Sequence, residues 1–378
     1  MTEGSRTGGS RTGGSRTGGS RTGGSSTGWP RAGEEPSATA LLRTCPEDFR
    51  VSEALGFEPS GDGEHVFLQL EKRNLNTVDL VHRVASLSGT PERDIGYSGL
   101  KDRNAVTRQW LSIRMAGRVE PAWSELEGGG DIRLLQTARH RRKLRRGVHR
   151  ANDFSILLRE VTGDRGALEQ RLCEVQREGV PNYFGEQRFG RGGSTLEQAR
   201  QWVAGGARRV TRTRRSLYLS ALRAWLFNSL LASRVKAGSW NSIVAGDVCI
   251  LQGTRSHFHC ESPDEDIRQR ARCGDLHPAL PLWGRGTPCL ALKRAAAELA
   301  SVGGALEICE FLEGAGLEVA WRPARALADD FCWQFCDDGG LQLDFALGAG
   351  SYATAVLAEF IRYHDASGNN KEKGSEGD

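Results

Sequence analysis

The chain has 378 residues, of which 38% are hydrophobic and 26% are charged, and its formal net charge is +4. This length favours two domains plus tails, and the composition fits a soluble globular protein. No apolar run approaches the ~20 residues that a membrane span needs, and the N-terminus has no apolar segment typical of a secretion signal. We therefore expect a cytoplasmic protein with no membrane partner.

The cysteines and histidines indicate neither a disulfide framework nor a metal site. The nine cysteines are odd in number and scattered, and they include no C-x-x-C pair. The run His257-Phe258-His259-Cys260 lacks a second pair at ligand spacing, so we interpret it as part of a strand or loop. No bound metal is expected.

Positive charge gathers in two runs, Arg139–Arg150 and Arg208–Arg215. Such dense runs in a nearly neutral chain favour binding of a polyanion, although a solvated charged face is the alternative. The candidates for contacts with an RNA backbone are Arg141, Arg142, Lys143, Arg145 and Arg146.

Both ends of the chain are predicted to be disordered. The first 35 residues are of low complexity and contain Gly-Ser-Arg-Thr four times at a five-residue step. A segment of this composition buries too little apolar surface to fold. We predict a tail over residues 1–40, order from about Leu41, and a second tail over residues 363–378.

The first half of the chain alternates strands and helices. His65–Lys72 alternates apolar and polar residues and predicts a strand. Asn76 or Thr77 caps a helix that ends at Gly89. The further elements predicted in this half are a strand leading from Phe49 to Glu53, strands at Thr107–Ile113, Ile132–Thr137 and Phe154–Val161, and a helix at Ala167–Glu178.

The second half contains one long amphipathic helix, Ser216–Ala237, whose apolar residues are expected in the core. The other predicted elements are strands at Asp247–Leu251 and Leu341–Leu347, a charged surface segment at Ser262–Asp275, and helices at Ala295–Glu313 and Ala353–Ile361. The chain has no G-x-G-x-x-G, P-loop or G-x-S-x-G motif, which argues against an enzyme with a nucleotide cofactor and against a serine hydrolase.

Residues 96–110 are the most informative stretch. Asp102 stands between Lys101 and Arg103, after a glycine-containing segment and before a predicted strand. This pattern predicts a carboxylate at a loop tip, where catalytic groups are often found. The flanking charges favour the ionised carboxylate and suit a substrate that carries phosphate. On these residues alone, an ordinary solvated turn is the better interpretation.

Longer motifs change that interpretation. The chain contains Gly99-Leu100-Lys101-Asp102-Arg103-x-Ala105, and later Pro181-Asn182-Tyr183-Phe184-Gly-x-Gln187-Arg188-Phe189-Gly190. With further segments in the same order, from about Leu41 to Ile361, the sequence resembles the tRNA pseudouridine synthase D (TruD) family. The resemblance implies an α+β fold, in which a mostly antiparallel mixed sheet with flanking helices is interrupted by an inserted α/β domain. The implied catalytic domain is 41–177 with 327–362, and the insert is 178–326.

The resemblance also implies a function and a site. Members of this family isomerise uridine to pseudouridine in tRNA, and in bacteria they do so at position 13 of the D-arm. They use neither a cofactor nor a metal. Asp102 matches the catalytic aspartate, acting either on C1′ or on the 2′ proton. The residues that match the uridine pocket are Phe49, Asn152, Phe154 and Tyr352. Arg43, Arg50 or Lys101 is expected to pair with Asp102.

Two further alternatives remain open from the sequence. A protein of this fold that has lost the chemistry would be an RNA-binding protein or chaperone, and the same chemistry can act on another RNA. A glycosidase or nucleosidase built on a lone Asp102 is disfavoured, because a glycosidase normally uses two carboxylates and because the chain has basic runs. We expect tRNA as the partner and a monomer as the functional form.

Overall fold

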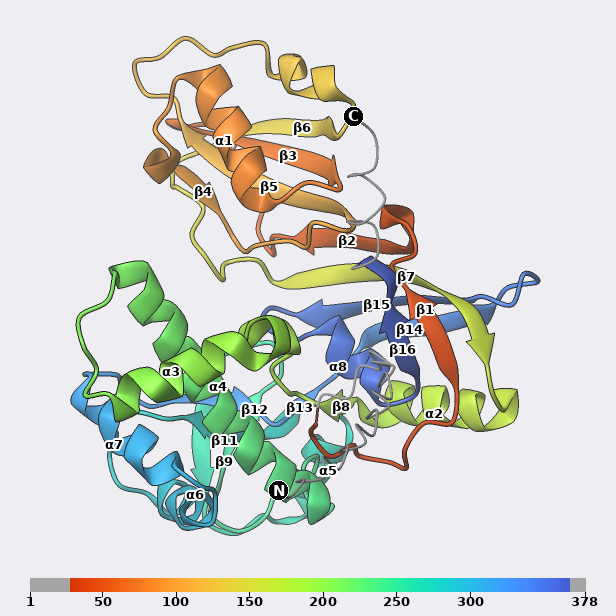
Figure 1. The fold of residues 1–378 in the computed structure, drawn as a ribbon, viewed down its shortest axis with the longest axis vertical. Helices are drawn as coiled ribbons and strands as arrows, with labels where there is room; N and C mark the ends of the chain where they lie inside the picture. Colours follow the sequence, from red (N-terminus) through yellow and green to blue (C-terminus); the bar gives the residue numbers. More distant parts are fainter. Residues whose placement is uncertain (1–27, 368–378) are drawn as a thin grey trace, which may run out of the picture.

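A computed structural model describes residues 28–367 of the chain, and the strands of this part form three sheets (Figure 1). The largest sheet contains β1 (Thr39–Leu42), β2 (Phe49–Ala54), β3 (His65–Arg73), β4 (Ile95–Tyr97), β5 (Val106–Arg114), β6 (Ile132–His140), β7 (Ala151–Thr162), β14 (Asp329–Phe335), β15 (Leu341–Gly348) and β16 (Arg362–Asp365). Its main path runs β14-β15-β7-β2-β5-β3-β6. Only the pairs β2–β5 and β1–β16 are parallel. The predicted α+β class, with a mostly antiparallel mixed sheet, is confirmed.

The large sheet has a separate core at each end. At one end, alternate residues of β3 pack with α1 (Thr77–Ser88) and the short helix Trp123–Gly129. At the other end, β7 and β15 pack with α2 (Arg165–Glu178) and α8 (Ala353–Ala358). Strands β2 and β5 pair in parallel between these two cores. The two cores therefore hold the middle of the sheet from either end. This part contains residues of β2 and β7 and the loop before β5.

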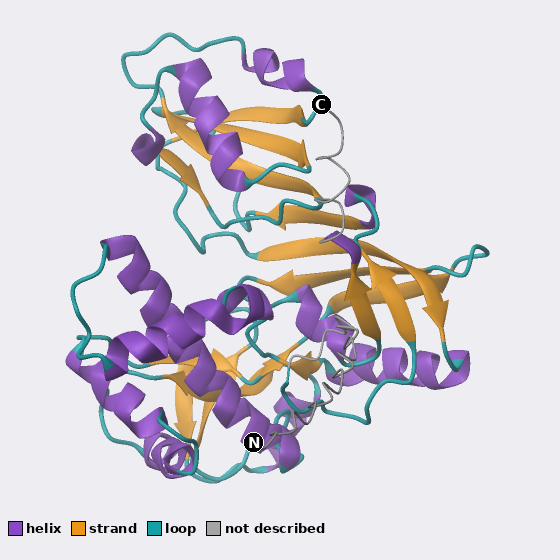
Figure 2. Ribbon diagram, viewed as in Figure 1, coloured by secondary structure: helices purple, strands orange, loops and turns teal. Residues whose placement is uncertain are grey.

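Residues between the paired strands β8 (Val180–Pro181) and β13 (Arg325–Ala326) form a second, smaller unit, which we call the inserted domain. Its sheet contains β9 (Asp247–Leu251), β10 (His257–Cys260), β11 (Leu276–Leu282) and β12 (Ala320–Pro323). Its helices are α3 (Ser194–Ala204), α4 (Arg212–Lys236), α5 (Glu265–Arg272), α6 (Leu290–Ala300) and α7 (Ala305–Gly314), and Figure 2 shows how rich in helix this part is. Helix α4 contributes more buried residues to the main core of the inserted domain than any other element does.

Three predicted segments differ from the structure. The single helix expected at Ala295–Glu313 is two helices, because Gly304 with φ of 74° starts α7 after a turn. The charged segment Ser262–Asp275 contains α5, whose first turn is capped where Ile267 N donates to Asp264 at 2.8 Å. The helix expected at Ala353–Ile361 ends at Ala358, and the chain then enters β16.

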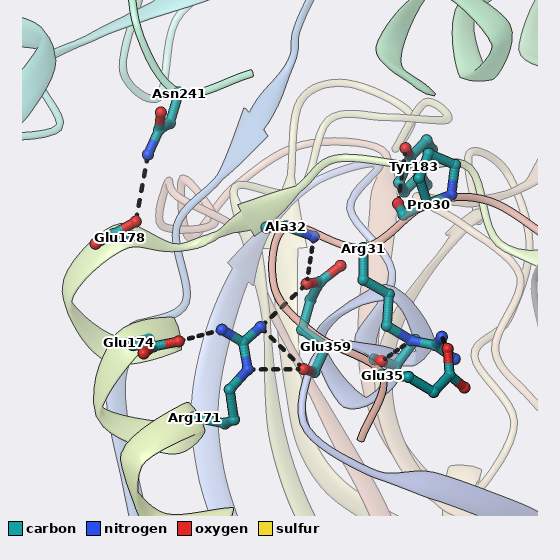
Figure 3. A network of polar contacts seen from close by, with 11 residues as sticks. Pro30, Arg31, Ala32, Glu35, Arg171, Glu174, Glu178, Tyr183, Asn241 and Glu359 are labelled. Atoms are coloured by element: carbon teal, nitrogen blue, oxygen red, sulfur yellow. Dashed lines mark hydrogen bonds and ion pairs between the residues drawn. The ribbon is translucent and has the colours of Figure 1, made fainter. Parts of the chain in front are cut away.

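The prediction of a disordered tail over residues 1–40 is wrong for residues 28–40, which the structure describes. The prediction of a second disordered tail over residues 363–378 is wrong for residues 363–365, which belong to β16. Trp29 stacks on Tyr183, and β1 pairs with β16. In the segment between Trp29 and β1, the backbone N–H of Ala32 donates to the side-chain carboxyl of Glu359 at 2.9 Å. Arg171 donates to the backbone carbonyl of Glu359 at 3.1 Å (Figure 3). Burial raises the pKa of the Glu359 carboxyl to about 7. The Gly-Ser-Arg-Thr repeats lie outside the described residues.

Gly179 is the residue at which α2 gives way to the inserted domain. Its φ is +71°, and a Cβ atom there would lie 2.3 Å from the carbonyl oxygen of Ala326. Gly316 has a similar φ of +78° but open space around it. We expect Gly179→Ala to lower the free energy of unfolding by ~1–3 kcal/mol more than Gly316→Ala does, because only the first change forces strand β13 to move. Denaturant titration of both variants measures this difference, and equal losses would contradict it.

Candidate active site

The predicted catalytic and pocket residues converge on one cleft of about 260 Å³. Its lining includes Asp102, Phe49, Asn152, Phe154 and Tyr352. Asp102 lies in the loop between β4 and β5, as predicted, and the others come from the start of β2, from β7, and from the residue before α8. The fold thus joins segments that are far apart in the sequence.

Strand register explains why the pocket side chains share one face of the sheet. In the antiparallel pair of β2 and β7, Phe49 lies opposite Ile156, Val51 opposite Phe154, and Glu53 opposite Asn152. These positions alternate along both strands, so their side chains project to the same side. Phe154 stacks on Phe345 with centroids 5.4 Å apart, and it contacts Phe49 edge-on at 6.1 Å.

Arg43 is the cation that contacts the side-chain carboxylate of Asp102. Its Nη2 lies 3.4 Å from Oδ2 of Asp102, and its Nη1 lies 3.2 Å from Oδ2 of Asp365. The Arg43 side chain is 9% exposed and covers the ring of Phe49 at 4.4 Å. Arg43 has a φ of 59°, in the left-handed region that residues with side chains rarely adopt. Of the three cations proposed from the sequence, the structure therefore selects Arg43.

Lysines hold the loop of Asp102 rather than its carboxylate. Lys72 is fully buried, and its ammonium donates to the backbone carbonyl of Asp102 at 2.8 Å. Burial lowers the pKa of Lys72 to about 8, against the opposing effect of the Asp102 charge. Lys101, expected to flank the carboxylate, instead pairs with buried Glu53 at 2.8 Å, and its N–H donates to Thr77 at 2.9 Å. These contacts fix the backbone on both sides of the loop tip.

Asn152 has one satisfied and one unsatisfied polar atom. Its Nδ2 lies 3.2 Å from Nε2 of His149, and its buried Oδ1 has no hydrogen-bond partner within residues 28–367. Burial, followed by the charge of Lys101, lowers the pKa of His149 and favours a neutral imidazole. The free oxygen is an acceptor available to a ligand in the cleft.

Sequence reasoning missed several residues that line the cleft. His149 is at the end of the first basic run, which was considered only for its charge. Gln187 and Arg188 come from the inserted domain, within a motif used only to recognise the family. Arg188 donates to the hydroxyl of Tyr352 at 2.9 Å. The motif was therefore also a usable signal for a site residue.

The basic run after β6 divides into engaged and free side chains. Arg141 makes a bidentate contact with Asp62, Lys143 donates to the carbonyl of Arg93, and Arg146 donates to the hydroxyl of Tyr97. Arg142 and Arg145 are exposed and have no hydrogen bond or ion pair to any other described residue. Of the five candidates for RNA-backbone contacts, these two are therefore the ones that are free to meet an external anion.

Two larger cavities do not contain Asp102. One, of about 660 Å³, lies between residues 32–38 and α2, and the other, of about 460 Å³, lies on the opposite side of β2 near Arg50 and Asp153. In the described part of the chain, no three His, Cys, Asp or Glu side chains are placed to hold a metal ion, and His257–Cys260 forms β10. Between residues 28 and 367, the helices are all too short or too polar to cross a bilayer.

Comparison with known proteins identifies the family. The sequence matches the family described as tRNA pseudouridine synthase D (TruD) over residues 32–196 and 194–360. It is 45% identical over 334 residues to the tRNA pseudouridine synthase D of Methylococcus capsulatus, covering 88% of this chain and 94% of the relative. For the tRNA pseudouridine synthase D of Nitrosococcus oceani, the identity is 45% over 338 residues, with 89% and 94% covered.

A solved structure shares the fold. The crystal structure of the putative tRNA pseudouridine synthase D from Methanosarcina mazei superposes with a TM-score of 0.62 at 19% identity, covering 88% of this chain and 95% of that chain. Together, the sequence match, the similar relatives and the shared fold show that this chain belongs to the tRNA pseudouridine synthase D family.

Proposed function

We propose that this protein isomerises uridine to pseudouridine in tRNA, at position 13 in the D-arm, with Asp102 as the catalytic carboxylate. The observation that carries the proposal is the convergence of Asp102 and the four matched pocket residues on one cleft, in a chain of this family. The protein needs no cofactor for this reaction and acts as a monomer on tRNA in the cytoplasm.

The reaction breaks the N1–C1′ bond, rotates the uracil, and joins C5 to C1′. Asp102 acts on the sugar, either by attack on C1′ or by removal of the 2′ proton, and both routes use an ionised carboxylate. Arg43 supplies the counter-ion at 3.4 Å, and the Asp102 side chain remains 37% exposed, so a substrate can reach it. Because the uracil stays in the site, no second carboxylate is required to activate water.

The cleft suits a single nucleotide extracted from folded RNA. Its volume of about 260 Å³ is below the ~300–1,000 Å³ of typical small-molecule sites. Phe154 offers a half-buried aromatic ring on which a base can stack. The unpartnered oxygen of Asn152 can accept the N3–H of uracil, while His149 holds the other end of the amide.

The proposed role of the Asp102 carboxylate can be tested by removing its charge. We expect Asp102→Asn to lower the rate of pseudouridine formation by at least ~10³-fold, because the amide neither attacks C1′ nor accepts the 2′ proton. The affinity for tRNA should change little, because the substitution removes no contact with the phosphate backbone. Carbodiimide treatment and primer extension on tRNA report the product, and filter binding reports affinity.

Asp365→Asn is the matched control for this prediction. Asp365 also pairs with Arg43 and is 38% exposed, close to the 37% of Asp102, but it does not line the cleft. The control should retain activity within about 5-fold, because Asp365 does not line the cleft and Arg43 keeps its contact with Asp102 in this variant. Full activity of Asp102→Asn, or an equal loss in both variants, would exclude Asp102 as the catalytic group.

The next prediction concerns RNA binding by the basic run. Replacing Arg142 and Arg145 together by Gln should weaken tRNA binding and reduce the slope of log affinity against log salt by about 1.5, as expected for two lost phosphate contacts. Arg141→Gln should have a smaller effect, because Asp62 already neutralises that guanidinium.

Helix α5 offers a control with the same change in net charge. Arg270 and Arg272 pair with Asp275 and Glu265, and neither lines the cleft. Replacing both by Gln should leave the salt slope near its original value. If this control reduced the slope as much as the Arg142 and Arg145 variant, the binding would reflect total charge rather than a specific surface.

A further inference from the structure

The hydroxyl of Tyr352 is held as a hydrogen-bond acceptor. Arg188 of the inserted domain donates to it through Nη2 at 2.9 Å and through Nε at 3.2 Å. A guanidinium has donors only, so the phenol must direct its own proton elsewhere. Within residues 28–367, no hydrogen bond from this hydroxyl to a protein acceptor is found. Since Tyr352 lines the cleft, the O–H is available to a molecule bound there.

The ring of Tyr352 has little freedom to turn away. A Cβ atom at Gly185 would lie 2.9 Å from Cδ1 of Tyr352, so the ring packs directly on glycine backbone. The ring of Phe184 meets it edge-on at 6.1 Å. Arg188 is itself fixed, because it donates to Ser220 on α4 at 3.0 Å and lies over Phe184.

A second arginine of the inserted domain holds the backbone next to Tyr352. Arg322 on β12 donates to the carbonyl of Gly350 at 3.0 Å and to the side chain of Asn182 at 2.6 Å. Its guanidinium lies over Phe184 at 4.1 Å. Burial lowers the pKa of Arg322 to about 10, which still leaves it charged at neutral pH. The inserted domain therefore restrains both the backbone and the hydroxyl at this edge of the cleft.

We propose that Arg188 is a positioning residue that directs the O–H of Tyr352 to a carbonyl oxygen of the target uracil. This inference rests on the proposed function. When the N1–C1′ bond breaks, its electron pair leaves with N1, and the negative charge spreads over the carbonyl oxygens of the uracil. A preoriented donor at one of these oxygens stabilises that charge without transferring a proton. The adjacent guanidinium strengthens the donor by polarising the phenol.

A double-mutant cycle tests whether the effect of Arg188 on the reaction rate requires the hydroxyl of Tyr352. The proteins are the wild type, Tyr352→Phe, Arg188→Gln and the double variant, and the readouts are the single-turnover rate and the affinity for tRNA. We expect Tyr352→Phe to slow the reaction about 5- to 30-fold, as for one lost hydrogen bond, with tRNA affinity within about 3-fold of wild type. The double variant should be no slower than Arg188→Gln alone, because both changes remove the same interaction.

Controls separate positioning from folding. Arg223, also in the inserted domain, donates to the carbonyls of Leu282 and Glu318 and does not line the cleft, so Arg223→Gln should leave the rate unchanged. Arg188→Lys retains a donor and should recover part of the rate if Arg188→Gln is poorly folded. Thermal unfolding of each variant identifies losses of structure.

Substrates with sulfur in place of one carbonyl oxygen test the contact from the RNA side. The two substrates carry 2-thiouridine or 4-thiouridine at the target position. Since sulfur is a weaker hydrogen-bond acceptor than oxygen, one of the two should lower the reaction rate of the wild type. The same substrate should not lower the rate of Tyr352→Phe any further, because that variant lacks the donor. Additive losses in the cycle, or a wild-type rate for Tyr352→Phe, would overturn the inference. A wild-type protein that forms no pseudouridine would overturn the proposed function and this inference with it, whereas an active wild type with additive losses overturns only the inference.

Discussion

The site depends on a buried ammonium that binds a backbone carbonyl. Lys72 donates to the carbonyl of Asp102 from inside the sheet, and burying that charge is costly unless it is well hydrogen-bonded. Lys101, paired with Glu53, fixes the preceding residue of the loop. Because the backbone is held in this way, the Asp102 side chain can stay half-exposed beside Arg43 and still have a defined position. The two lysines thus hold the backbone of the loop, and Arg43, from outside the loop, contacts the carboxylate.

The sequence predicts those elements whose signal is local. Strand β3 follows from the alternation of apolar residues, and α1 ends at Gly89, which has a φ of 62°. The pairing of β1 with β16 has no such signal, because each strand has four residues and the partners are separated by almost the whole chain. The break before α7 depends on the left-handed conformation of Gly304, one of many glycines in the chain, so periodicity alone extended a single helix across it.

Much of the candidate site was also predictable, but only through family motifs. Composition and spacing give no reason to bring Asp102, Asn152 and Tyr352 together, because the sheet register and the inserted domain do so. The partner of Asp102 stayed open from the sequence, since three cations were equally plausible. The structure decides it, because the buried Arg43 side chain lies over Phe49 and contacts the carboxylate at 3.4 Å.

The pairing of β8 with β13 has a consequence for how such a protein can diversify. Because β8 and β13 are paired, the two chain ends of the inserted domain lie side by side, about one strand spacing or ~4.8 Å apart. The large sheet takes β1–β7 from the chain before this junction and β14–β16 from the chain after it, whatever length of chain lies between them. Grafting a different module at this point would keep the loop of Asp102 intact and change the outer surface beside the cleft, provided that the new module again supplies a partner for the tyrosine hydroxyl.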